Sequence, residues 1–165
     1  MYKYAVAESR NGREVYVNLI ASSAGRYLSR QPYVINLIKE VLVSKRLSGP
    51  EIVVEHDMGR IIGNTDIVAT NEKDTIFYAQ PNKKTVFSRF AKNRYPSPSP
   101  KLTIILKQDS DGNYEISDTW IGPSSPPFPG DEKATPVSKQ YWLTHALVAD
   151  AQMIQSKSIT KICPY

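Results

Sequence analysis

This sequence of 165 residues has few of the side chains from which metal and redox centres are built. It contains one cysteine, Cys163, and two histidines, His56 and His145. A single cysteine excludes an internal disulfide framework and metal sites made of paired cysteines. The two histidines do not show the HExxH spacing of a zinc hydrolase. We therefore expect no metal site and no cofactor.

Glycine-rich phosphate loops and long apolar runs are missing as well. Neither GxxxxGK[ST] nor GxGxxG occurs, which argues against P-loop ATP chemistry and Rossmann dinucleotide chemistry. No apolar run approaches the roughly 20 residues that a membrane-spanning helix needs. The first residues lack the apolar region of a signal peptide. The expectation is a cytoplasmic protein without a membrane segment, of bacterial or phage origin.

Two consecutive stretches each lack charges of one sign, the first lacking acidic and the second lacking basic residues. Residues 75–107 contain seven Lys and Arg and no acidic residue, whereas residues 109–132 contain six Asp and Glu and no basic residue. The net charge of +5 is therefore unevenly distributed along the chain. A basic surface attracts polyanions, of which phosphate backbones are the commonest, so RNA is the expected partner class.

The hydrophobic pattern predicts an α+β fold in a single domain, residues 1–165. An N-terminal strand or hairpin around the Asn11-Gly12 turn is followed by one amphipathic helix over residues 32–47, in which apolar residues recur at helical spacing. Short strand-like runs follow, and the strongest turn signal is Asp111-Gly112. These runs predict a four- to five-stranded, mostly antiparallel sheet.

Proline interrupts this pattern in two places. Residues 95–100 alternate Pro and Ser as a stiff, polyproline-like connector, and residues 122–136 form a Pro-rich loop with five prolines. A short C-terminal helix is predicted over residues 137–149, with Thr135 as its N-cap. Residues 152–165 are expected to form a tail or a docking strand.

His56 is the first candidate catalytic residue. It lies at the end of a predicted strand in Glu55-His56-Asp57, and Arg60, a candidate binding residue, follows four residues later. Histidine transfers protons near neutral pH, and a neighbouring carboxylate can orient it. The alternative interpretation is an exposed loop histidine among charged neighbours.

The basic, aromatic segment 83–95 is the candidate nucleic-acid site. Its aromatic residues would stack on bases while its cations meet phosphate, a composition typical of single-stranded RNA or DNA binding. The alternative is an amphipathic helix anchored by its aromatic residues. The candidate binding residues here are Lys83, Lys84, Phe90 and Tyr95, together with the cations Arg89, Lys92 and Arg94.

Two weaker candidates lie on the acidic side of the chain. Ser117, on the last predicted strand, could donate a hydrogen bond to phosphate, although an ordinary strand serine is the simpler interpretation. The loop 109–113 is acidic but lacks the final glutamate of a calcium-binding EF-hand, because Trp120 stands there.

A helix before a small antiparallel sheet, with His, Arg, Lys and Ser near strand ends, resembles the barnase–EndoU–colicin–RelE group of small ribonucleases over residues 32–121. The resemblance implies metal-independent RNA cleavage by the 2′-hydroxyl. It implies that His56 is the acid or base, that Arg89, Lys92 and Arg94 stabilise phosphate, and that Ser117 is an auxiliary donor. The alternative to this resemblance is a bacterial or phage domain without an assigned function.

Three hypotheses follow from the sequence. The first is an RNA-interacting domain that acts as a metal-independent ribonuclease of toxin or phage type. The second is a non-catalytic module that binds RNA or an acidic protein through the basic 83–94 surface. The third is an assembly protein in which the acidic stretch of one copy meets the basic stretch of another. The sequence does not set the oligomeric state.

Overall fold

The computed structural model describes residues 4–19, 31–82, 84–149 and 153–165. The chain divides into two compact units, each described here by itself. Unit 1 comprises Met1–Ile62 and Pro100–Ser124, and unit 2 comprises Gly63–Ser99 and Ser125–Tyr165. The single domain expected from the chain length stays a prediction.

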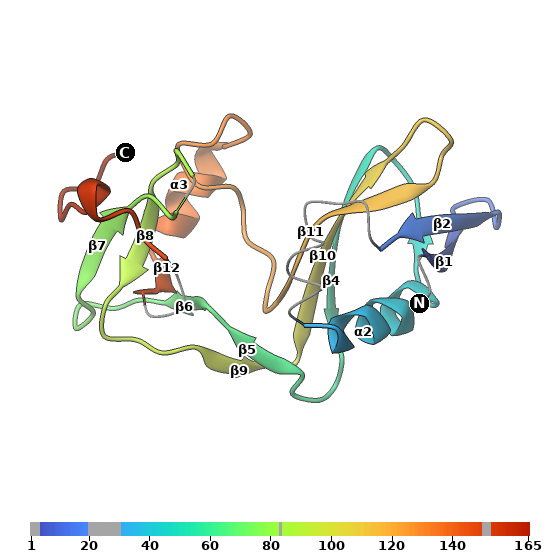
Figure 1. Ribbon diagram of the computed structural model, residues 1–165, viewed down its shortest axis with the longest axis horizontal. Coiled ribbons are helices and arrows are strands. Elements are labelled where there is room, and N and C mark those ends of the chain that lie inside the picture. Colours follow the sequence, from blue (N-terminus) through green and yellow to red (C-terminus); the bar gives the residue numbers. More distant parts are fainter. Residues whose placement is uncertain (1–3, 20–30, 83, 150–152) are drawn as a thin grey trace. The chain divides into compact units, whose positions relative to one another are not determined.

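Unit 1 is a six-stranded sheet with one helix (Figure 1). The strand order is β3-β1-β2-β11-β10-β4, and the N-terminal hairpin joins the rest through a parallel pairing of β2 with β11. The helix α2 buries Val34, Leu37, Ile38, Val41 and Leu42. The elements are β1 (Tyr4–Ser9), β2 (Glu14–Asn18), α2 (Tyr33–Leu42), β3 (Arg46–Leu47), β4 (Glu51–Asp57), β10 (Lys101–Gln108) and β11 (Tyr114–Ile121).

The core of unit 1 lies between α2 and one face of this sheet. Side chains alternate across a strand, so Val54 on β4, Ile104 on β10 and Ile116 on β11 share the buried face with the helix. On the opposite face, the Trp120 indole donates a hydrogen bond to the Pro123 carbonyl at 2.9 Å. The Glu55 carboxylate accepts the Ser124 N–H at 2.7 Å. These two bonds fold residues 122–124 back onto unit 1.

Unit 2 contains a four-stranded sheet of order β6-β12-β8-β7 and a two-stranded ribbon of β5 and β9. The C-terminal strand β12 runs parallel to β8 and antiparallel to β6. The Phe77 and Phe90 rings stack with centroids 5.3 Å apart. The elements are β5 (Gly63–Thr65), β6 (Ile67–Ala69), β7 (Ile76–Ala79), β8 (Ser88–Ala91), β9 (Ser97–Ser99), α3 (Pro136–Trp142), β12 (His145–Val148) and the 3₁₀ turn η2 (Ser156–Ser158).

The predicted fold class is wrong. The protein is rich in sheet, with 40% strand and 14% helix, and its described residues form twelve strands in three sheets with two α-helices. The expected helix 32–47 ends at Leu42 because residues 46–47 pair with β1 as β3. The expected helix 137–149 ends at Trp142, and its second half is β12.

Two other local predictions differ from the structure. The Pro/Ser segment 95–100 contains β9, which pairs with β5, rather than a free polyproline connector. The runs on either side of Asn71–Asp74 are strands, but they do not form a hairpin, because β12 and β8 lie between β6 and β7. A loop with turn residues between two strands therefore does not imply that those strands pair.

Candidate nucleic-acid interface

The predicted site residues are distributed over both units. His56, Arg60 and Ser117 belong to unit 1. The rest of the described candidates belong to unit 2, and Lys83 lies outside the described residues. The catalytic set inferred from the ribonuclease resemblance is therefore not gathered within one unit. The candidates in unit 2 are Lys84, Arg89, Phe90, Lys92, Arg94 and Tyr95.

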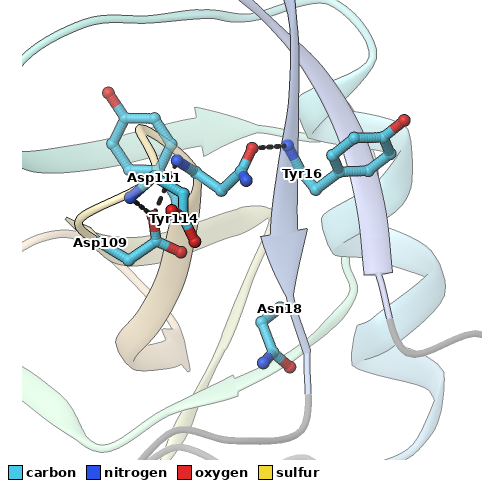
Figure 2. Close-up of a pocket in the computed structure, with 6 residues that line it drawn as sticks. Tyr16, Asn18, Asp109, Asp111 and Tyr114 are labelled. Atoms are coloured by element: carbon cyan, nitrogen blue, oxygen red, sulfur yellow. Dashed lines mark hydrogen bonds between the residues drawn. The ribbon is translucent and has the colours of Figure 1, made fainter.

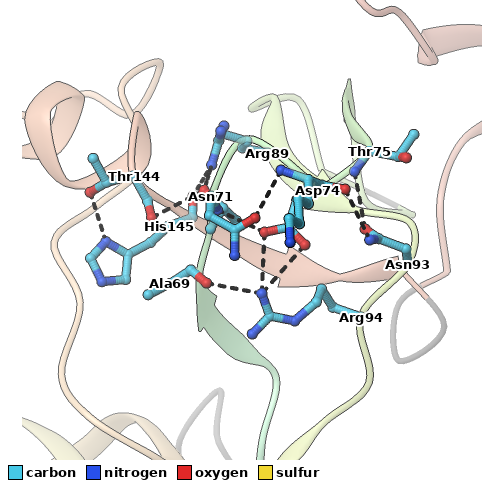
Figure 3. Close-up of polar contacts among 11 residues, drawn as sticks. Ala69, Asn71, Asp74, Thr75, Arg89, Asn93, Arg94, Thr144 and His145 are labelled. Atoms are coloured by element: carbon cyan, nitrogen blue, oxygen red, sulfur yellow. Dashed lines mark hydrogen bonds and ion pairs between the residues drawn. The ribbon is translucent and has the colours of Figure 1, made fainter.

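Arg89 has a structural role at the centre of the unit 2 sheet. Its Nη1 donates to the Thr70 hydroxyl at 2.8 Å and to the His145 carbonyl at 3.1 Å (Figure 3). These bonds connect β8 to the end of β6 and the start of β12. The guanidinium is partly buried, so Arg89 is not an exposed phosphate contact.

The Arg94 side chain also bonds to other residues of unit 2. Its Nη1 donates to the Ala69 carbonyl at 3.1 Å and lies 3.2 Å from the Asp74 carboxylate, whose side chain is only 3% exposed. The pKa of Asp74 is lowered, first by the Asn71 backbone N–H and then by Arg94. The carboxylate thus stays ionised at neutral pH, and Arg94 fixes the chain after β8 to the loop after β6.

Asn93 strengthens the same attachment. The Thr75 N–H donates to Asn93 Oδ1 at 3.0 Å, and the Asn93 amide donates to the Lys73 carbonyl at 3.4 Å. One residue earlier, the Lys92 N–H donates to the Thr75 carbonyl at 2.9 Å. Residues 92–96, which we call the connector, are therefore held to the loop 70–75 by backbone, amide and ionic contacts (Figure 3).

The connector leaves two predicted contact residues facing solvent. Lys92 is exposed and forms no ion pair within the described residues, and Tyr95 is 75% exposed. Lys73, in the attached loop, is exposed too. We call Lys73, Lys92 and Tyr95 the connector surface. Sequence reasoning missed Lys73, because its place beside the connector depends on a contact between distant parts of the chain.

The other two described candidates of the basic segment differ in accessibility. Phe90 is 0% exposed and stacked on Phe77, so it cannot stack on a base. Lys84 is exposed, but it precedes β8 whereas Lys92 follows it. Of the aromatic candidates, only Tyr95 presents an accessible ring.

In unit 1, His56 lies within electrostatic range of Glu40 of α2, which pairs with Arg60. It follows Ile52 and Val54 on the core-facing side of β4 and is partly buried. Arg60 forms a two-pronged ion pair with Glu40 of α2, with Nη1–Oε1 and Nη2–Oε2 distances of 3.1 and 2.9 Å. The pKa of Glu40 is lowered, first by its hydrogen bond from Arg60 and also by the charges of Arg60 and His56. Glu40 carries no sequence signal, since it lies on an ordinary helix face.

Ser117 occupies a bulge in the pairing of β10 with β11. Ile116 is opposite Leu106 and Asp118 is opposite Ile105, so Ser117 is the extra residue. Ile105, which borders the bulge, is opposite Val53 on β4. Val53 precedes His56 by three residues, so the bulge and His56 are about 10 Å apart along the strand direction. Ser117 therefore does not extend the His56 group.

One of the cavities in unit 1 has an acidic wall. It has a volume of about 410 Å³ and lies at the turn between β10 and β11 (Figure 2). Asp109 Oδ1 accepts the N–H groups of Asp111 and Asn113 at 2.9 and 3.0 Å, so this carboxylate shapes the turn. With two carboxylates in its wall, the cavity repels phosphate. Its lining consists of Tyr16, Asn18, Asp109, Asp111, Asn113 and Tyr114.

The described residues show neither a membrane-spanning helix nor a metal-binding cluster. No helix in the described part of the chain is long and apolar enough to cross a membrane. Over those same residues, no group of three or more His, Cys, Asp or Glu side chains is arranged to hold a metal ion. In comparisons with known proteins, the chain matches no family model, no curated protein and no solved structure.

Proposed function

We propose that the protein binds single-stranded RNA through the connector surface of unit 2. The observation that carries the proposal is the combination of Lys92 and Tyr95, an exposed cation and an exposed aromatic ring three residues apart, on a connector that the protein holds in place. Lysine meets the phosphate and tyrosine stacks on a base, the two contacts from which sequence-tolerant binding is built.

The charge distribution supports this choice of unit. Unit 2 has ten Lys and Arg against six Asp and Glu, a net charge of +4, and the remaining +1 belongs to unit 1. The acidic cavity described above belongs to unit 1. A phosphate backbone is therefore attracted to unit 2.

The attachment of the connector supports binding as well. A loop that must become ordered on binding loses affinity, because the ordering costs conformational entropy. Here Asn93 and Arg94 already join the connector to the loop 70–75. Two cations that the sequence assigned to phosphate thus contribute indirectly, because Arg94 positions Tyr95 and Arg89 holds the sheet underneath.

The proposal is tested by fluorescence anisotropy with a labelled single-stranded RNA. Tyr95→Ala is expected to weaken binding by about 1–3 kcal/mol, which is roughly 5- to 150-fold, the range for one stacked base. Lys92→Gln is expected to weaken it by roughly fivefold through loss of one phosphate contact. The matched controls in unit 1 are Tyr33→Ala, where the native ring is 44% exposed, and Lys107→Gln, where the native lysine is exposed.

Both controls should bind RNA as the wild type does. If the four variants bind equally well, or if the wild type binds no RNA at low salt, the connector surface is not an RNA site.

A second candidate function, metal-independent RNA cleavage, is favoured by the His56, Arg60 and Glu40 group. A partly buried histidine within electrostatic range of Glu40, which pairs with Arg60, offers a proton carrier and a phosphate-stabilising cation within one unit. Such a reaction proceeds without a metal, because the 2′-hydroxyl of the RNA is the nucleophile.

We expect cleavage of single-stranded RNA to continue in EDTA and to fall by about 100-fold or more in His56→Ala, the usual contribution of a general acid or base. The matched control is the other histidine, which stacks on Tyr141 with ring centroids 4.0 Å apart and is engaged locally. Gel analysis of end-labelled RNA gives the rates. Equal rates in His56→Ala and His145→Ala, or no cleavage by the wild type, would remove the catalytic role of His56.

A further inference from the structure

Arg89 and Arg94 are both partly buried in unit 2, but only one of them has a counter-charge. Arg94 is paired with Asp74 at 3.2 Å. Arg89 has no carboxylate within 4.0 Å among the described residues; it donates to the Thr70 hydroxyl and the His145 carbonyl and also interacts with the Tyr78 hydroxyl, none of which carries a negative charge. A positive charge removed from water without a negative partner is costly. The protein therefore keeps one uncompensated cation in this sheet.

Three buried side-chain polar atoms of the described residues have no hydrogen-bond partner. One is Oγ of Ser88, which precedes Arg89 on β8 and therefore faces the other side of the sheet. The other two lie on the Arg89 side. They are Nε of Arg89 and the hydroxyl of Tyr165, and both are enclosed by the protein. Buried donors are nearly always bonded, so two orphaned donors near one unpaired cation call for a physical reason. Both are groups that donate to anions.

Two tyrosine hydroxyls also lie close to Arg89. Tyr78 lies opposite Arg89 in the pairing of β7 with β8, and the Tyr165 ring meets the Tyr78 ring edge-on at 5.7 Å. Burial is the main cause of the raised pKa of Tyr78, which Cys163 also raises and Arg89 lowers. The pKa of Tyr165 is raised as well, first by burial. Both phenols thus keep their protons at neutral pH and can donate hydrogen bonds.

We infer that Arg89, Tyr78 and Tyr165 form a binding site for a small tetrahedral oxyanion, of which phosphate is the biological example. An oxyanion supplies the negative charge that Arg89 lacks and accepts hydrogen bonds from Nε and from the phenol hydroxyls. Arginine suits this task because its planar donors match phosphate oxygens. This inference does not depend on the proposed connector surface.

The C-terminal segment, residues 153–165, contributes Tyr165 to the site. This segment lies along the edge of β7, where Tyr78 and Thr160 exchange two backbone hydrogen bonds of 2.7 and 2.8 Å. Ile159 and Ile162 are 54% and 79% exposed, so the Tyr165 ring against Tyr78 is the main aromatic contact of the segment. For an ion to reach Arg89, we propose that this segment moves away from β7, which breaks the Tyr78–Thr160 backbone bonds.

The probe for this site is inorganic phosphate, compared with chloride at equal ionic strength in thermal unfolding of the full chain. If phosphate binds with a Kd near 10 mM, 100 mM phosphate should raise the unfolding midpoint by roughly 3–6 °C. Arg89→Gln should abolish the difference between the two salts, whereas Lys92→Gln should retain it. The Lys92 variant separates this site from the connector surface.

Tyr165→Phe keeps the test decisive if Arg89→Gln does not fold. Removal of an unsatisfied buried hydroxyl should leave the protein in chloride at least as stable as the wild type, while the response to phosphate falls. A nucleoside 5′-monophosphate is compared with inorganic phosphate in the same assay. If the site takes a phosphoryl group on a larger ligand, the nucleotide should raise the unfolding midpoint more than inorganic phosphate does; if it takes the free ion, the nucleotide should not. The inference is overturned if wild type and both variants respond equally to phosphate, or if the wild type does not respond.

Discussion

Trp142→Ala is expected to lower the free energy of unfolding by about 3–5 kcal/mol, the usual cost of removing a large buried aromatic side chain. Trp142 is 1% exposed, and its ring lies 4.4 Å from that of Phe128 and 5.0 Å from that of Tyr141. Its indole N–H also donates to the Pro126 carbonyl at 3.1 Å. The variant therefore leaves a cavity and an unpaired carbonyl at once. Urea unfolding followed by circular dichroism measures the loss.

Trp120→Ala is the matched control, because Trp120 makes a similar bond to Pro123 but is only partly buried. It should cost clearly less than Trp142→Ala. Equal costs for the two variants, or a loss below about 1 kcal/mol for Trp142→Ala, would mean that Trp142 does not anchor unit 2.

The second large effect is expected for Tyr114→Ala in unit 1, again about 3–5 kcal/mol. Tyr114 is 1% exposed and belongs to the core cluster of the six-stranded sheet. Its hydroxyl donates to the Gly49 carbonyl at 2.9 Å. Tyr114→Phe removes only this bond and should cost about 1 kcal/mol. Urea unfolding of both variants separates the ring from the hydroxyl.

Tyr33→Ala again serves as the control, since a ring that is 44% exposed should change stability little. If Tyr114→Phe is as damaging as Tyr114→Ala, the hydroxyl bond dominates and packing of the ring is secondary.

Local turn chemistry was the part of the fold that could be predicted. Gly12 and Gly112 have φ angles of +82° and +83°, and each lies in the turn of an antiparallel pair where Asn-Gly and Asp-Gly had predicted one. Such turns depend on two or three adjacent residues. A single sequence therefore carries enough information to place them.

Pairings between distant segments could not be predicted in this way. The spacing of Trp142, Leu143, Ala146 and Leu147 fits a helix, yet α3 ends at Trp142 and residues 145–148 alternate between buried and half-buried positions as a strand. The strand is set by its neighbours β6 and β8, which come about 80 and 55 residues earlier in the chain. Short apolar runs fit either period, and the tertiary partners decide between them.

The candidate site, too, could be predicted from the sequence only in part. Composition correctly marks residues 89–95 as basic and aromatic, but it cannot show which cations bond to the protein itself. Arg89 and Arg94 donate to backbone carbonyls, and Phe90 is buried. Of the cations and aromatic residues in 89–95, Lys92 and Tyr95 are the exposed ones, and Lys73 joins them through a contact that the sequence does not encode locally.

The salt dependence of RNA binding tests the central claim most directly. With Lys73 and Lys92 on phosphates, the logarithm of the association constant should fall with the logarithm of salt concentration at a slope of about −1.4, the value for two contacts with a single strand. In Lys92→Gln the slope should shrink by about one half, while in Lys107→Gln it should not change. A slope of zero for the wild type, or the same slope in Lys92→Gln, would contradict RNA binding at the connector surface.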